Sequence, residues 1–155
     1  WKTAIAGLGN SSPVVWGNRL FLQSATEDGK ERLLLCVDTA SGKILWSRTV
    51  PGSAATINPR NTLASSTPAT DGTRVYALFW DGSGLLLHSY DFSGKLVWKR
   101  EVGAYASQHG AGASPIVYRN KVIILNDQDA SSRLMAFDTA TGARETSTCV
   151  TALLS

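Results

Sequence analysis

Short apolar runs separated by polar turns make up most of the chain. Three of these runs directly follow a tight polar turn, and they lie at 19–23, 75–79 and 122–125. Runs of Val, Ile, Leu and aromatic residues after such a turn predict the second strand of a β-hairpin. After each hairpin a polar loop leads to a third apolar run, and a short turn leads to a fourth. The pattern therefore predicts groups of four short antiparallel strands.

Three landmarks recur at intervals of about 50 residues, which is typical of a repeat protein. The first is a proline near the start of each group, at Pro13, Pro68 and Pro115. The second is an aspartate that ends the third run, at Asp38, Asp91 and Asp138, and the third is a glycine shortly after it, at Gly42, Gly94 and Gly142. An Asp side chain can cap a turn and a Gly can adopt positive φ, so these residues predict a structural turn before the fourth strand.

Four antiparallel strands in a unit of about 50 residues correspond to one blade of a β-propeller. The sequence thus predicts an all-β fold, a propeller fragment of about three four-stranded antiparallel blades, taken from a larger ring of about seven or eight blades. We expect 1–10 to end a preceding blade, 11–48, 66–100 and 113–145 to form the three blades, and 49–65 and 101–112 to connect them. The tail 146–155 departs from the pattern, and we expect it to be disordered or truncated.

The two ends carry the clearest departures from a complete repeat. Trp1-Lys2 matches Trp98-Lys99, so the chain is expected to begin in the fourth strand of a preceding blade. Thr146 stands where the repeat predicts a tryptophan. Three blades would leave apolar faces uncovered, so we expect the partners to include missing blades of the same chain or a second copy.

Composition narrows the classes of partner. The chain is 43% hydrophobic and 17% charged, with a formal net charge of +3, and its Lys and Arg residues are scattered. Nucleic acid is not an expected partner, because no basic run is dense enough to follow a phosphate backbone. No apolar run approaches the roughly 20 residues of a transmembrane helix. Cys36 is expected to be a buried thiol, and with Cys149 it could form one disulfide or none.

The segments DTASGKILW, DFSGKLVW and DTATGARE resemble the D-x-x-x-G-K-x-x-W signature of pyrroloquinoline-quinone-like (PQQ-like) propeller repeats, over about residues 11–145. The resemblance implies that Trp46 and Trp98 pack between neighbouring blades, as Trp1 would for the preceding blade. The segments HGAGASP and SSTPATDG are similar to those of the BamB-like subgroup. That subgroup implies a periplasmic or otherwise extracytoplasmic protein.

The same family includes quinoprotein dehydrogenases, which hold a quinone and a calcium ion at the ring centre. The chain has no adjacent Cys pair of the kind many of those enzymes use. We therefore expect no cofactor, with PQQ and Ca²⁺ entering only under the alternative that the chain is a fragment of such an enzyme. Fold resemblance alone does not transfer chemistry.

Candidate binding residues lie in loops on the rim where the blades connect. His109 and Gln108 are expected to face Asp127 and Asp129, and a His near two carboxylates could bind a metal or act as a general base. The same residue types are also ordinary turn formers. Arg60 could bind an anionic partner. His88 is expected to be a packed or edge histidine.

The sequence leaves three functions open, and it assigns no catalytic residue and no metal ligand. The first is a non-enzymatic scaffold that binds a protein partner. The second is a fragment of a PQQ-dependent quinoprotein dehydrogenase. The third is a polysaccharide-binding or glycan-processing propeller, in which Trp80 and Tyr105 would stack on sugars.

Overall fold

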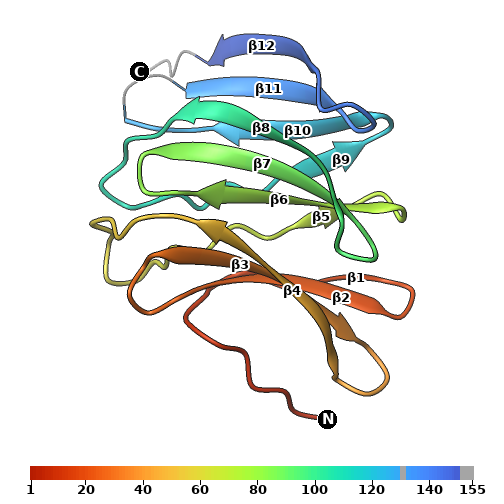
Figure 1. Ribbon diagram of the computed structural model, residues 1–155. Coiled ribbons are helices and arrows are strands. Elements are labelled where there is room, and N and C mark those ends of the chain that lie inside the picture. The colour runs from red at the N-terminus through yellow and green to blue at the C-terminus, as the bar shows by residue number, and fades with distance from the viewer. Residues whose placement is uncertain (130–131, 151–155) are drawn as a thin grey trace.

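Three four-stranded antiparallel sheets stack on one another in chain order (Figure 1). The computed structural model describes residues 1–129 and 132–150. Blade 1 contains β1 (Val14–Trp16), β2 (Arg19–Ala25), β3 (Glu31–Asp38) and β4 (Ile44–Pro51). Blade 2 contains β5 (Ala69–Thr70), β6 (Arg74–Trp80), β7 (Gly84–Asp91) and β8 (Leu96–Ala104). Blade 3 contains β9 (Ile116–Tyr118), β10 (Lys121–Asn126), β11 (Ser132–Asp138) and β12 (Arg144–Val150). The all-β propeller-blade prediction is confirmed.

Each sheet is a meander in which consecutive strands pair. The short first strands β1, β5 and β9 contact one another in sequence, so they lie along one side of the stack. Register places each recurrent aspartate opposite the first residue of the second strand, as in the pair Arg19 and Asp38. The predicted turns have the expected backbone, since Gly17, Gly72 and Arg119 all have positive φ.

The fourth strands are longer than the apolar pattern suggested. β4 continues to Pro51 and β8 to Ala104, both beyond the expected blade ends. The expectation that the tail departs from the blade at 146 is wrong for 146–150, because β12 pairs with β11 as far as Val150. Backbone pairing does not need the repeat tryptophan, and residues such as Thr and Val favour strands. Residues 151–155 lie outside the described part of the chain.

Two apolar cores hold the stack together, one at each contact between blades. The first interface, between blades 1 and 2, is built on residues such as Phe21, Leu34 and Phe79. The second interface, between blades 2 and 3, is built on residues such as Leu87 and Ile124. Because side chains alternate across a sheet, each central strand of blade 2 contributes one face to each interface.

Cys36 lies in the first interface. Its thiol is free and fully buried, as expected, and burial raises its pKa to about 11. A thiol with this pKa stays protonated near neutral pH, so it packs as a small apolar group. The side chain of Cys149, the other half of the disulfide considered above, is outside what the structure describes.

Candidate functional site

The rim loops of neighbouring blades are joined by backbone hydrogen bonds. Gly52 N donates to Lys30 O at 2.8 Å, and Ser53 N donates to Asp81 O at 2.7 Å. In the next blade Tyr105 N donates to Ser83 O at 3.0 Å. The connection after blade 1 therefore bonds to the β2–β3 loop of blade 1 and to the β6–β7 loop of blade 2. The connection after blade 2 bonds to the same β6–β7 loop. This arrangement brings the predicted rim segments together on one side of the stack.

The segments around His109 and Asp129 do meet, as the sequence suggested. Gln108 N donates to Asp129 Oδ2 at 3.1 Å, and Ala106 N donates to the Gln128 side-chain oxygen at 3.1 Å. The two segments border an open hollow of about 410 Å³. Its walls hold His109, Asp127 and Asp129.

The polar groups of this hollow are used mainly to shape their own loops. Ser132 Oγ donates to Asp127 Oδ1 at 2.6 Å, and Asp129 caps the backbone of Gln108. His109 is exposed, and its carbonyl accepts a hydrogen bond from Asn61 Nδ2 at 2.6 Å. Among residues 1–129 and 132–145, whose side chains the structure describes, no group of three His, Cys, Asp or Glu is placed to hold a metal ion.

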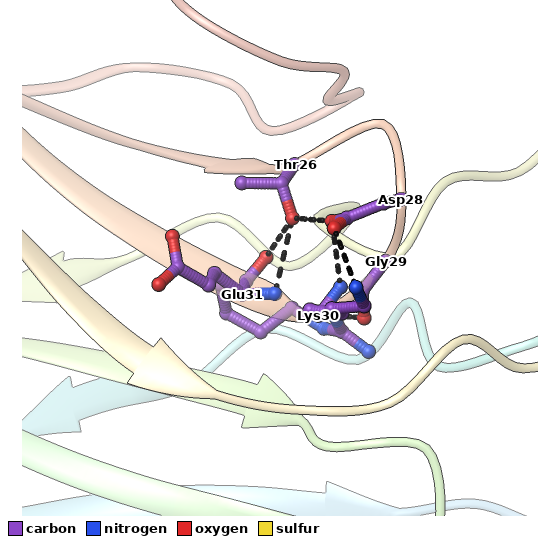
Figure 2. A network of polar contacts seen from close by, with 6 residues as sticks. Thr26, Asp28, Gly29, Lys30 and Glu31 are labelled. Carbon is purple, nitrogen blue, oxygen red and sulfur yellow. Dashed lines mark hydrogen bonds and ion pairs between the residues drawn. The ribbon is translucent and has the colours of Figure 1, made fainter.

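The β2–β3 loop shows the same use of polar side chains (Figure 2). Thr26 Oγ1 donates to Asp28 Oδ1 at 2.7 Å, and the same oxygen accepts from Lys30 N at 3.1 Å. Lys30 Nζ lies 3.5 Å from Asp28 Oδ2. The hydrogen bond from Thr26 is the main cause that lowers the pKa of Asp28. The carboxylate therefore closes a turn.

The recurrent aspartates behave in the same way. Asp38, Asp91 and Asp138 each accept a hydrogen bond from a Ser or Thr hydroxyl in the turn that follows. These hydroxyl bonds are the first cause that lowers the pKa of each carboxyl group. The turns end at Gly42, Gly94 and Gly142, which all have positive φ.

Gly94 and Gly142 are each covered by a tryptophan from the fourth strand of the preceding blade. Trp46 Nε1 donates to Phe92 O at 3.0 Å, and a Cβ at Gly94 would lie 2.8 Å from the Trp46 ring. Trp98 Nε1 donates to Thr139 O at 2.9 Å and covers Gly142 in the same manner. These two tryptophans therefore dock one blade on the next.

Trp1 makes the equivalent contact on blade 1. Its Nε1 donates to Thr39 O at 2.8 Å, and its ring covers Gly42. Farther along the same segment, Leu8 pairs with Ala25. The N-terminal segment thus lies across the outward side of blade 1, below the sheet in Figure 1.

Two arginines that the repeat pattern did not single out strengthen this docking. Arg100 Nε donates to Gly142 O at 2.9 Å, and its Nη2 donates to Thr141 O at 2.7 Å. Arg48 Nε makes the matching bond to Gly94 O, and its guanidinium lies 5.3 Å from the centre of the Trp46 ring. A repeated spacing in the sequence could have indicated them, because each arginine lies two positions after a docking tryptophan.

Two expected rim residues are not available to a sugar. Trp80 is 6% exposed and Tyr105 is 8% exposed, and their rings meet edge to face in the second interface, 5.8 Å apart. The glycan-stacking role predicted for this pair is therefore wrong. Trp80 precedes a polar loop, but strand alternation turns its side chain toward blade 3. Arg60 is exposed, and its carbonyl accepts a hydrogen bond from Asn10 Nδ2 at 3.2 Å.

A buried arginine, which the repeat pattern also did not single out, joins the rim to the first interface. Arg32 is fully buried. Its Nε donates to Trp80 O at 2.7 Å, its Nη1 to Gly29 O at 2.8 Å and its Nη2 to Ser53 O at 2.9 Å. One side chain thus ties blade 1 to both blade 2 and the connection between them.

Comparison with known proteins gives a family and a fold. A family model described as outer membrane protein assembly factor BamB matches residues 1–153. No curated protein matches the chain. The solved structure of a europium-containing methanol dehydrogenase matches 88% of this chain at 19% identity and a TM-score of 0.63. A quinohemoprotein alcohol dehydrogenase from Comamonas testosteroni matches 93% of this chain at 20% identity and a TM-score of 0.61.

The chain spans only 24% and 21% of the lengths of these two proteins. At these identities the likeness concerns the fold. The residues that the structure describes include no helix with the length and apolar character needed to cross a membrane.

Proposed function

Because the chain belongs to the PQQ-like propeller family described as outer membrane protein assembly factor BamB, we propose that it is part of a non-enzymatic scaffold. The scaffold belongs to an extracytoplasmic bacterial protein and offers its rim to a protein partner. Loops held on a rigid framework are common sites of recognition.

The observation that carries this proposal is the state of the rim carboxylates. Asp28, Asp81 and Asp129 all accept hydrogen bonds from backbone groups of the rim loops. A carboxylate engaged in this way orders a loop, whereas a catalytic base needs a lone pair directed at substrate. An ordered rim lowers the entropy cost of binding a partner, which supports a docking role.

The second candidate, a fragment of a quinoprotein dehydrogenase, is favoured by the fold likeness to two alcohol-oxidising enzymes. That likeness concerns the fold, and proteins with the same fold can have many different functions. A direct test adds PQQ and Ca²⁺ to the full-length protein and measures dye-linked alcohol oxidation. We expect no turnover, and robust turnover would overturn the scaffold proposal.

The partner itself can be tested by site-specific crosslinking. A photo-crosslinking residue at Gln108, which is exposed on the rim, should form an adduct with an envelope protein in cells. The same residue at Lys43, exposed in the turn after β3, is the matched control because that turn lies at the other end of the strands. Adducts of equal yield at both positions, or at neither, would contradict a rim-directed partner.

A further inference from the structure

A groove of about 570 Å³ opens between blades 1 and 2, away from the rim hollow. The end of β4, at Val50 and Pro51, forms one wall. Strands β7 and β8 form the rest, with Leu86 and His88 in β7. Both blades that form the groove are present in the chain, so it does not depend on a neighbouring blade.

A buried imidazole lies in the wall of this groove. His88 is 6% exposed, its ring meets Phe79 edge to face, and its Nδ1 lies 2.9 Å from the Tyr90 hydroxyl. Nε2 has no hydrogen-bond partner among the described residues, and it is not among their fully buried unpaired polar atoms. Burial, and then the charge of Lys99, lower the pKa of His88 to about 4, so the ring is neutral near pH 7.

Two residues of opposite charge, Lys99 and Glu101, line the groove from strand β8. Lys99 lies opposite His88 and Glu101 lies opposite Leu86, so both point to the blade 1 side of the sheet. Among the described residues neither side chain has an ion pair or a hydrogen bond. Arg100, between them, points the other way and is bonded to blade 3.

Their spacing suits an extended chain. Residues two apart on a strand lie about 7 Å from each other on one face. A second strand laid along β8 would present its own alternate side chains at the same spacing, and opposite charges across such a pair are favourable.

We propose that this groove binds an extended peptide segment that carries an acidic and a basic side chain two positions apart. The acidic side chain pairs with Lys99 and the basic side chain pairs with Glu101. The proposal deepens the proposed function, since it rests on a protein partner, but it uses a groove that shares no lining residue with the rim hollow.

The test measures binding of three fluorescein-labelled peptides to the chain by fluorescence anisotropy. Their central sequences are Val-Glu-Val-Lys-Val, Val-Lys-Val-Lys-Val and Val-Glu-Val-Glu-Val. We expect the mixed peptide to bind at least about tenfold more tightly than either like-charged peptide, which corresponds to about 1.4 kcal/mol.

Charge exchange makes the test specific. K99E should shift the preference to the Lys-Val-Lys peptide, and E101K should shift it to the Glu-Val-Glu peptide. The double variant K99E/E101K should restore the preference for the mixed peptide. K43E makes the same charge change outside the groove and should leave the preference unchanged.

Three results for the peptide affinities would contradict the proposal. Equal affinity for all three peptides, no binding, or a preference that ignores K99E would overturn it. Rim crosslinking at Gln108 with no peptide binding would leave the scaffold proposal standing and remove only this groove. Charge-dependent peptide binding without rim adducts would support the groove and would contradict a rim-directed partner.

Discussion

The two blade interfaces are built from equivalent positions but from different chemistry. In the first interface Arg32 and His88 are buried together with the hydroxyl of Tyr90. The second interface has Leu85 at the position of Arg32, and Met135 and Phe137 at the positions of His88 and Tyr90. Blade 2 takes part in both, so the difference comes from a few side chains and not from the architecture.

The two interfaces show two ways of joining equivalent blade surfaces. The second interface gains stability from apolar area removed from water. The first must also satisfy each buried polar group, and Arg32 does so by bonding three backbone carbonyls. Such an interface is more sensitive to single substitutions, because a lost partner leaves buried carbonyls without a hydrogen bond.

The largest expected effect is at Arg32. R32A should lower the free energy of unfolding by about 3 to 5 kcal/mol, because it leaves a cavity and three unpaired carbonyls. L85A, at the equivalent place in the second interface, should cost about 2 to 4 kcal/mol from its cavity alone. Urea unfolding followed by tryptophan fluorescence measures both. A smaller loss for R32A than for L85A would break the comparison.

His88 should give the first interface a pH dependence that the second lacks. Its pKa falls from 6.5 to about 4 on folding, so between these values the unfolded chain binds more protons. Stability should therefore fall as the pH drops through this window, by about 3 kcal/mol in all. H88M copies the residue of blade 3 and should remove this part of the pH dependence. Identical pH profiles for both proteins, measured by urea unfolding from pH 7 to pH 4, would refute the assignment.

The tryptophan docking should be alike in the two interfaces. G94A and G142A should each cost about 2 to 3 kcal/mol, because each glycine has positive φ and a Cβ would strike a tryptophan ring. G17A is the matched control, since Gly17 has positive φ but no atom lies within 4 Å of its Cβ position, and it should cost about 1 kcal/mol. Thermal unfolding of the three variants would show whether the two docking sites differ.

The smallest effect on stability concerns the outward face of blade 3, which meets no blade among the described residues. Leu125 and Leu134 pair across β10 and β11 on this face and are 41% and 45% exposed. We expect the chain to self-associate through this face. L125Q introduces the residue that blade 1 has at this position, Gln23, and should reduce the average mass in light scattering with little change in stability. A monomeric parent chain at high concentration would contradict the expectation.

Local turn chemistry was the most predictable part of the fold. The Asp38 and Gly42 pair, and its two counterparts, could be interpreted correctly because the side chain and the backbone it caps are neighbours in sequence. The meeting of Gln108 with Asp129 was also predictable from the repeat. The role of Trp80 was not, because its exposure depends on Tyr105 folding back against it.

The pattern of apolar runs and turns was enough to specify three four-stranded sheets, since strand pairing and turns depend on periodicity and nearby residues. Which polar groups are free to act was decided between the blades. Arg32, an ordinary strand residue in the sequence, is buried because Trp80 and Ser53 bring carbonyls to it from a distance. His88 and Lys99 border a groove only because blade 1 stacks on blade 2, with the end of β4 as the facing wall. Burial and charge pairing are properties of the assembled surfaces, so they appear only when the sheets stack.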